Sequence, residues 1–185
     1  MLLLTTSRRP TPRIRTFCRD LACSIPNVVR INRGKLSLDG IVEKTLELNA
    51  NQVIIVDRWK GGPGKIELFK IGQEGLVPVP PIMYVSSIKL RREFDRAKTK
   101  PVRSLIITTS SENSNEIIRI ARSLSNFLNV PRSQMDKAVL KSKTSMHIST
   151  NGLHRTQVTF MLLLSENVEI GPRITLSHVV GEIKK

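Results

Sequence analysis

The feature that most constrains the fold of this chain is an internal repeat. Residues 2–7 read LLLTTS and residues 105–110 read LIITTS, and the same offset continues without a gap into the segment that follows. In both copies, apolar residues then recur at the spacing of one face of an α-helix. The matched pairs are Ile14 and Ile117, Phe17 and Ile120, Cys18 and Ala121, Leu21 and Leu124, and Ile25 and Leu128. Each copy therefore predicts a buried strand, a polar loop and an amphipathic helix.

The first copy carries clear signals for the ends of its helix. Thr11 suits the N-cap and Pro12 the first helical position, because proline lacks the amide hydrogen that this position leaves unused. Pro26 marks the end of the helix. VVRI (28–31) then predicts a second strand.

The next segment predicts a further helix and two strands. Ser37 can cap a helix, and QVIIV (52–56) predicts a strand rich in β-branched residues. GGPG (61–64) predicts a turn into the alternating strand KIELFKI (65–71). Because strands alternate with helices, we expect parallel pairing in a β-α-β-α-β-β unit.

The rest of the chain predicts a connector and a second α/β repeat. VPVPP (77–81) is expected to break regular structure. The expected division is a first repeat over 1–85, a basic helix and connector over 86–101, and a second repeat over 102–185. In the second repeat the pattern predicts helices near 114–129 and 133–141, and strands around 144–150, 156–164 and 173–179.

Charge is the strongest indication of a partner. Thirty Lys and Arg against fifteen Asp and Glu give a net charge of +15. A domain so basic points to a polyanion such as nucleic acid, an anionic membrane surface or an acidic protein, the alternative being a basic surface that only aids solubility. No apolar run is long enough to span a membrane, and the opening MLLL is too short for a signal-peptide core, so a cytoplasmic protein is expected.

Residues that could support catalysis or bind a metal are scattered. Cys18 and Cys23 have a C-x4-C spacing that matches no common zinc pattern, and the three histidines lie far from them in sequence. No Ser–His–Asp or paired-carboxylate arrangement follows from the spacing. We therefore expect neither an enzyme nor a cofactor or metal site.

Arginines surround the first strand-to-helix loop. Arg8, Arg9, Arg13 and Arg15 lie in SRRPTPRIR, whereas the corresponding loop of the second copy, SSENSNE (110–116), has no basic residue. A helix N-terminus presents unpaired amide groups and the positive end of the helix dipole, so added arginines make a good phosphate site. This loop either contacts RNA or is a solvated basic turn.

A second basic cluster follows the second strand. Arg30, Arg33 and Lys35 lie in RINRGK, where Gly34 suggests a turn with positive φ. Because the carboxyl ends of parallel strands meet at one edge of a sheet, we expect this cluster to lie near the first loop.

A third basic cluster, DRWKGGPGK (57–65), could extend the same edge with Arg58, Lys60 and Lys65. Trp59 either stacks on a base or packs on the protein. GGPGK lacks the glycine spacing and the Ser or Thr of a phosphate-binding P-loop, which argues against nucleotide hydrolysis. Aromatic residues make up only 4% of the chain, which argues against an aromatic platform for single strands.

Several segments together resemble the Brix-domain ribosome-biogenesis proteins, especially the small archaeal members. The similarity covers nearly the whole chain. The segments are TTSRRPTPRIRTFCRDLA, PNVVRINRGK, VIIVDRWKGGPGKIELFKI and VEIGPRITL, the last containing Gly171, Pro172 and Arg173 of a family hallmark.

This resemblance implies a fold class and a function. The fold would be α/β, with two similar lobes from an internal duplication, each a mixed sheet flanked by helices like the anticodon-binding domain of class II aminoacyl-tRNA synthetases. The function would be non-catalytic binding of structured ribosomal or guide RNA during pre-rRNA processing and subunit assembly. The alternative is a scaffold for ribosomal or assembly proteins with only non-specific RNA affinity. A monomer is expected, and Arg33, Lys35 and Arg173 match family motifs.

Overall fold

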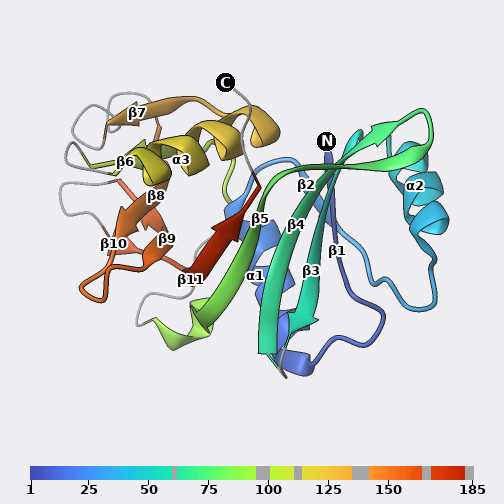
Figure 1. The fold of residues 1–185 in the computed structure, drawn as a ribbon, viewed down its shortest axis with the longest axis horizontal. Helices are drawn as coiled ribbons and strands as arrows, with labels where there is room; N and C mark the ends of the chain where they lie inside the picture. Colours follow the sequence, from blue (N-terminus) through green and yellow to red (C-terminus); the bar gives the residue numbers. More distant parts are fainter. Residues whose placement is uncertain (60–61, 95–100, 111–113, 135–141, 164–167, 182–185) are drawn as a thin grey trace.

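The fold is a mixed α/β arrangement, shown here in a computed structural model (Figure 1). The residues that the structure describes are 1–59, 62–94, 101–110, 114–134, 142–163 and 168–181. The elements of the first half are β1 (Leu2–Thr6), α1 (Pro12–Ser24), β2 (Val28–Arg30), α2 (Leu38–Glu47), β3 (Gln52–Trp59), β4 (Gly62–Gly72), β5 (Gly75–Lys89) and the 3-10 helix η1 (Arg91–Glu93). Those of the second half are β6 (Ile106–Thr109), α3 (Asn115–Leu128), β7 (Arg132–Gln134), β8 (Thr144–Thr150), β9 (Thr156–Leu162), β10 (Val168–Glu169) and β11 (Arg173–Val180).

One continuous sheet of eleven strands runs through both halves. Its order is β2-β1-β3-β4-β5-β11-β9-β8-β6-β7, with β10 paired to β9. In the first half β1 pairs in parallel with β2 and β3, and in the second half β6 pairs in parallel with β7 and β8. Parallel pairing is therefore confirmed, and the strand order read outward from the β5–β11 pair is the same in both halves. Descent from a duplicated unit stays a prediction.

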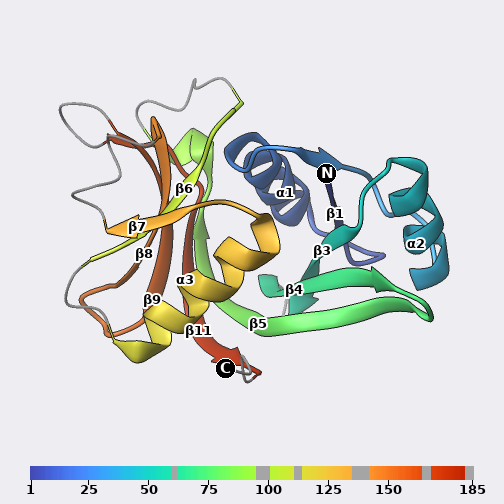
Figure 2. The same ribbon diagram turned by 90° about the horizontal axis from the view of Figure 1, so that it is seen from above.

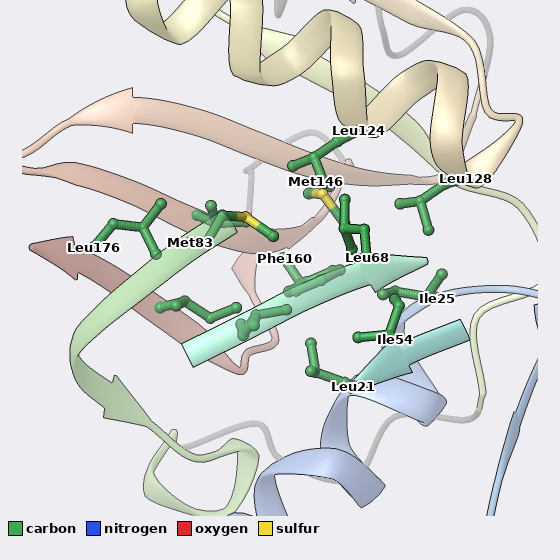
Figure 3. Close-up of a pocket in the computed structure, with 13 residues that line it drawn as sticks. Leu21, Ile25, Ile54, Leu68, Met83, Leu124, Leu128, Met146, Phe160 and Leu176 are labelled. Atoms are coloured by element: carbon green, nitrogen blue, oxygen red, sulfur yellow. The ribbon is translucent and has the colours of Figure 1, made fainter. Parts of the chain in front are cut away.

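The largest hydrophobic cluster of the described residues, the main core, contains residues of both halves. Helices α1 and α3 both pack on it, and all five predicted apolar positions of each helix are buried or packed against it. Figure 2 shows these two helices near one another, with α2 apart from them. Side chains of α1, α3 and the central strands also line a small apolar pocket of about 40 Å³ within this core (Figure 3).

Helix α2 covers the opposite face of the first half. Successive side chains of a strand point to opposite faces, so Leu2 and Leu4 of β1 join the main core while Leu3 joins a second cluster. That cluster also contains Ile41 of α2, together with Val53 and Ile55 of β3.

The predicted helix starts are confirmed. The hydroxyl of Thr11 accepts the amide hydrogen of Ile14, and Pro12 occupies the first position of α1. The hydroxyl of Ser37 likewise accepts the amide hydrogen of Gly40 at the start of α2. Each side chain satisfies a donor that the first turn of a helix leaves without a partner.

The expectation that VPVPP interrupts regular structure is wrong, because residues 77–81 belong to β5. This part of β5 pairs with β4, whereas β11 pairs with β5 only from Ile82 onward. Proline is tolerated where one side of a strand is unpaired, or at an irregularity such as the one that β4 shows between Ile66 and Leu68.

The expected helix over 86–101 is also wrong in its described part. Residues 86–89 continue β5 because they pair with β11, and only Arg91–Glu93 form a single 3-10 turn. Of the helix expected near 133–141, residues 133 and 134 lie in β7 instead, and residues 135–141 lie outside the described part of the chain.

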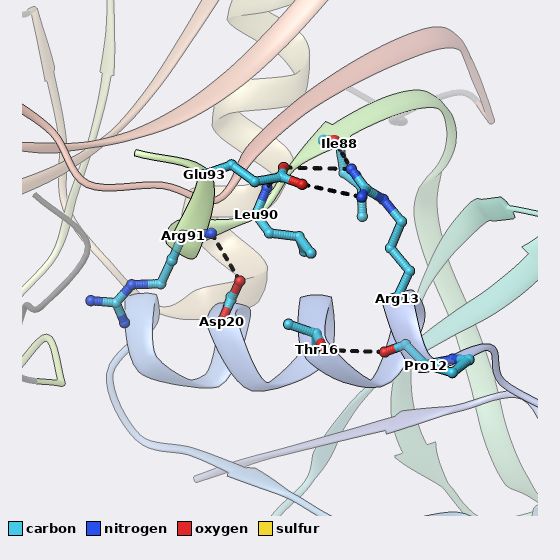
Figure 4. A network of polar contacts seen from close by, with 8 residues as sticks. All are labelled: Pro12, Arg13, Thr16, Asp20, Ile88, Leu90, Arg91 and Glu93. Carbon is cyan, nitrogen blue, oxygen red and sulfur yellow. Dashed lines mark hydrogen bonds and ion pairs between the residues drawn. The ribbon is translucent and has the colours of Figure 1, made fainter. Parts of the chain in front are cut away.

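Polar groups of α1 fasten the first half to the segment that follows β5 (Figure 4). The Asp20 carboxylate accepts the amide hydrogen of Arg91 at 2.9 Å. The guanidinium of Arg13 donates to the Ile88 carbonyl at 2.9 Å and forms an ion pair with Glu93 at 3.2 Å. These contacts fix the chain at the point where it leaves the first half.

The turn before β11 depends on a glycine. Gly171 has φ +60°, and a Cβ atom there would lie 2.5 Å from the ring of Phe94. Its carbonyl accepts the hydroxyl hydrogen of Ser24 on α1 at 3.0 Å. The first residue of the GPR motif is therefore set by both backbone conformation and close packing.

We expect Gly171→Ala to lower the free energy of unfolding by about 2–4 kcal/mol, because it adds a steric clash to the strain of positive φ. Gly34 has φ +55°, but a Cβ atom added there would meet nothing within 4 Å, so Gly34→Ala should cost only about 1 kcal/mol. Gly152→Ala, in open space, is the control. Urea denaturation measures all three, and equal losses at Gly171 and Gly34 would contradict the role of Phe94.

We expect the Asp20 carboxyl to make stability depend on pH. Burial is the main cause that raises its pKa above 3.8, opposed by the Arg91 amide and nearby arginine charges. Because its pKa is higher in the folded state than in the unfolded state, the contribution of this carboxyl to the free energy of unfolding is complete below pH 3.8. That contribution is lost as the pH rises through the pKa of the folded state. Asp20→Asn should therefore show a smaller change in unfolding free energy between about pH 4 and pH 7 than the wild type. Asp39→Asn, at an exposed position, is the control. If the free energy of unfolding of Asp20→Asn depends on pH just as that of the control does, the role of Asp20 is contradicted.

Candidate nucleic-acid interface

The carboxyl ends of β1 and β2 bring two basic loops together. Past the end of the β1–β2 ladder, the Ile31 amide donates to the Leu4 carbonyl at 3.0 Å, and the Thr5 hydroxyl donates to the Ile31 carbonyl at 3.3 Å. The chain beyond β1 stays beside β3 as well, because the Ser7 amide donates to the Val56 carbonyl at 3.0 Å. The expected proximity of these loops is confirmed.

Between these loops lies a concave site of about 400 Å³, which we call the arginine pocket. Six of its eight lining residues are polar or cationic, and the segment from Arg8 to Pro10 leads from it into the N-terminus of α1. The lining residues are Thr6, Arg8, Arg9, Pro10, Arg15, Asn32, Arg33 and Gly34.

The arginine pocket concentrates positive charge. Burial lowers the pKa of the Arg33 guanidinium, the positive charge of Arg8 lowers it further, and Asp57 partly opposes both. Among the described residues, none of the four arginines forms an ion pair with a carboxylate. Among the described residues these cations thus lie side by side without a carboxylate in ion-pair contact, an arrangement that favours a bound anion.

Backbone geometry fixes two of these arginines. The Arg33 Nε donates to the Leu36 carbonyl at 3.2 Å, and an Arg15 Nη donates to the Pro10 carbonyl at 3.2 Å. Gly34 has the positive φ expected from the sequence, which turns the chain directly after Arg33. Side chains held in this way lose less conformational freedom when they meet a phosphate.

Three predicted contacts are engaged within the protein. Arg13 pairs with Glu93, and the Nε and Nη2 groups of Arg173 both donate to the Glu169 carboxylate. Lys65 lies 3.0 Å from a Glu67 oxygen and 4.0 Å from an Asp57 oxygen. Their charges are largely balanced, so they are weaker candidates for a phosphate than the arginine pocket.

The remaining predicted contacts lie around the pocket or beyond it. Arg30 is half-buried and donates to the side-chain oxygen of Asn32 at 2.9 Å. Lys35 and Arg58 are exposed, on the loop after β2 and near the end of β3. Lys60 lies outside the described residues.

Sequence reasoning did not predict the uncharged lining residues Thr6, Pro10 and Asn32 as part of the site, and it predicted Gly34 only as a turn. All lie in the loops that the arginines had already indicated. Because they are uncharged, only the rule that parallel strands end at a common edge could have found them.

The described residues contain no group of three or more His, Cys, Asp or Glu that could hold a metal ion. Burial raises the pKa of the Cys18 thiol to about 12, so it is not a reactive thiolate. No helix in the described part of the chain is long and apolar enough to cross a membrane.

Curated relatives share sequence with much of the chain. A protein of Methanopyrus kandleri described as a probable Brix domain-containing ribosomal biogenesis protein is 33% identical over 131 residues, which is 69% of this chain and 66% of the relative. A protein of Pyrococcus horikoshii with the same description is 32% identical over 146 residues, 76% of this chain and 64% of the relative. The matches thus span just under two thirds of these relatives' own lengths. No protein-family model matches the chain.

Two solved structures share the fold. A probable ribosomal biogenesis protein from Aeropyrum pernix superposes with a TM-score of 0.78 at 22% identity, covering 97% of this chain and 98% of the other. An archaeal Imp4-like protein superposes with a TM-score of 0.65 at 19% identity, covering 97% and 99%. At these identities the two structures establish the fold, while the sequence relatives establish the kinship. The chain belongs to the Brix-domain family.

Proposed function

We propose that this protein is a non-catalytic ribosome-assembly factor that binds the phosphate backbone of ribosomal or guide RNA in the arginine pocket. The observation that carries the proposal is the convergence of Arg8, Arg9, Arg15 and Arg33 on one concavity without a carboxylate partner among the described residues. The names of the sequence relatives and the net charge of +15 support it.

The chemistry of the arginine pocket suits a phosphate in particular. Guanidinium groups present donors in a planar fork that matches two phosphate oxygens, and the positive end of α1 adds a fixed dipole. Such contacts position an RNA backbone but carry no base sequence. We therefore propose recognition by shape and charge, in the cytoplasm, by a protein that acts as a monomer.

A protein scaffold is the second candidate, and exposed leucines favour it. Leu38 and Leu46 lie two turns apart on α2 with 52% and 55% of their surfaces exposed, and Val77, in the β4–β5 hairpin that α2 contacts, is 49% exposed. Solvent-exposed apolar side chains on one helix face are typical of a surface that another protein covers.

Removing two adjacent, exposed arginines of the pocket should weaken RNA binding strongly. For the double variant Arg8→Ala and Arg9→Ala we expect at least a tenfold loss of affinity for a structured rRNA fragment, from about 1.5–3 kcal/mol per charged hydrogen bond. The slope of log K against log salt should become shallower by about one unit for each lost phosphate contact. Fluorescence anisotropy across a salt series measures both.

A matched control removes the same charge elsewhere. Arg119 and Arg122 are exposed on α3, away from the arginine pocket, and their double alanine variant should retain most of the affinity. Equal losses in the two double variants would mean that only net charge attracts RNA. Unchanged affinity of the Arg8 and Arg9 variant would overturn the assignment of the pocket and favour the scaffold, which Leu38→Ser and Leu46→Ser would then test by partner binding.

A further inference from the structure

Aromatic side chains converge on the outer face of the sheet, despite their low number in the sequence. The chain has one Trp and one Tyr, and the structure places Trp59 of β3 with its ring centre 6.0 Å from that of Tyr84 of β5. Tyr84 in turn stacks on His178 of β11, with ring centres 4.2 Å apart and planes 12° from parallel. We call these three residues the aromatic cluster.

The aromatic cluster lies on the face opposite the main core. Tyr84 stands between Met83 and Val85, which both point into that core, so its own side chain points away from it. Its partner across the strands is Lys65 of β4, and on the other side it pairs with His178. Three neighbouring strands, β4, β5 and β11, therefore present side chains together on this face.

The indole of Trp59 is available to a ligand. It is 53% exposed, and it meets Tyr84 edge-on at 76°, so neither face of the indole is stacked on that ring. Gly64 of β4 packs against this residue, because a Cβ atom on Gly64 would lie only 1.9 Å from that of Trp59. Residues 62–64 of GGPG, which were expected to form a turn, lie in β4 instead, and the absence of a side chain at Gly64 permits this close approach to Trp59.

The charges around the cluster suit a base rather than a phosphate. Lys65 is balanced by Asp57 and Glu67, so this face offers a roughly neutral surface with flat aromatic rings. Stacking of a base on an aromatic ring depends on the π-face and not on charge, and it is tolerant of base identity. Arg58 precedes Trp59 in β3 and is exposed, but successive side chains of a strand point to opposite faces, so the cluster itself holds no unbalanced cation among the described residues.

The cluster continues the edge that holds the arginine pocket. The carbonyl of Val56 in β3 accepts the amide hydrogen of Ser7, the residue before Arg8. Trp59 follows Val56 by three residues on the same strand. Burial and the charge of Arg8 lower the pKa of the Arg33 guanidinium, and the negative charge of Asp57 partly opposes them. The end of β3 that carries Trp59 therefore lies beside the chain that leads into the arginine pocket, so one RNA strand could contact both.

We propose that the aromatic cluster is a base-stacking site, which binds an unpaired nucleotide of the RNA whose backbone occupies the arginine pocket. This inference rests on the proposed function and specifies its ligand: the RNA must contain a single-stranded nucleotide next to the segment held by its phosphates. Trp59 is the main stacking residue, and the Tyr84–His178 stack supports it.

The only tryptophan of the chain provides the test. Selective excitation of Trp59 in the intact chain reports on a base stacked against it, and three probes of equal length separate bases from phosphates: oligoadenylate, an abasic ribose-phosphate oligomer and an RNA duplex. We expect oligoadenylate to quench the emission, and the abasic oligomer and the duplex to bind without comparable quenching. Equal quenching by the abasic oligomer would overturn the inference.

Substitutions then test the energy of stacking. Trp59→Leu keeps an apolar side chain without a ring, and it should weaken oligoadenylate binding by about five- to a hundredfold while duplex binding stays within about twofold. Trp59→Phe should retain most of the affinity, and Leu153→Ala, at a site 75% exposed in the turn between β8 and β9, is the control. Unchanged oligoadenylate affinity in Trp59→Leu would overturn the base-stacking site alone. Failure of the wild type to bind any of the three probes would overturn the proposed function as well.

Discussion

The rest of the structure depends on one hydrophobic core shared by both halves of the chain. Helices α1 and α3 contribute to it from either side, and the central strands β5 and β11 close it by pairing with each other. The free energy gained by burying apolar surface is roughly proportional to the area buried. Either half alone would leave these helix faces partly exposed and would lose much of this stabilisation. Hydrogen bonds also connect α1 to the Arg91 amide, after β5, and to the Gly171 carbonyl, before β11. The apolar core therefore holds the two halves together, and these hydrogen bonds add specific contacts between them.

The basic surface follows from the same arrangement. Parallel strands β2, β1 and β3 end at one edge, so the loops after β1 and β2 meet there beside the end of β3. The two loops that form the arginine pocket carry arginines without carboxylate partners among the described residues, whereas the end of β3 carries Asp57 and the exposed tryptophan. Charge and aromatic surface are thus separate but adjacent. A rigid sheet holds both, which reduces the entropy lost when a flexible RNA strand binds.

Local signals predicted much of this fold, and long-range pairing accounts for the errors. Thr11 and Ser37 cap helices as expected, because a cap depends only on neighbouring residues. Residues 86–89 looked helical but form a strand, since their pairing with β11 involves residues far along the chain. The loops after β1 and β2 were correctly placed together. The aromatic cluster was not foreseen, because composition counts Trp59 and Tyr84 as few, while the fold makes them neighbours.

The position of β11 in the sheet has a consequence for biosynthesis. This strand joins the two halves, yet it is the last strand in the described part of the chain. While a ribosome is still translating the residues before 173, the Ile82–Lys89 edge of β5 has no β11 to pair with. An unpaired edge of this kind invites pairing with another chain. The nascent protein therefore passes through a stage in which its first half is complete but its central seam is open, and the emergence of one strand both protects that edge and unites the molecule.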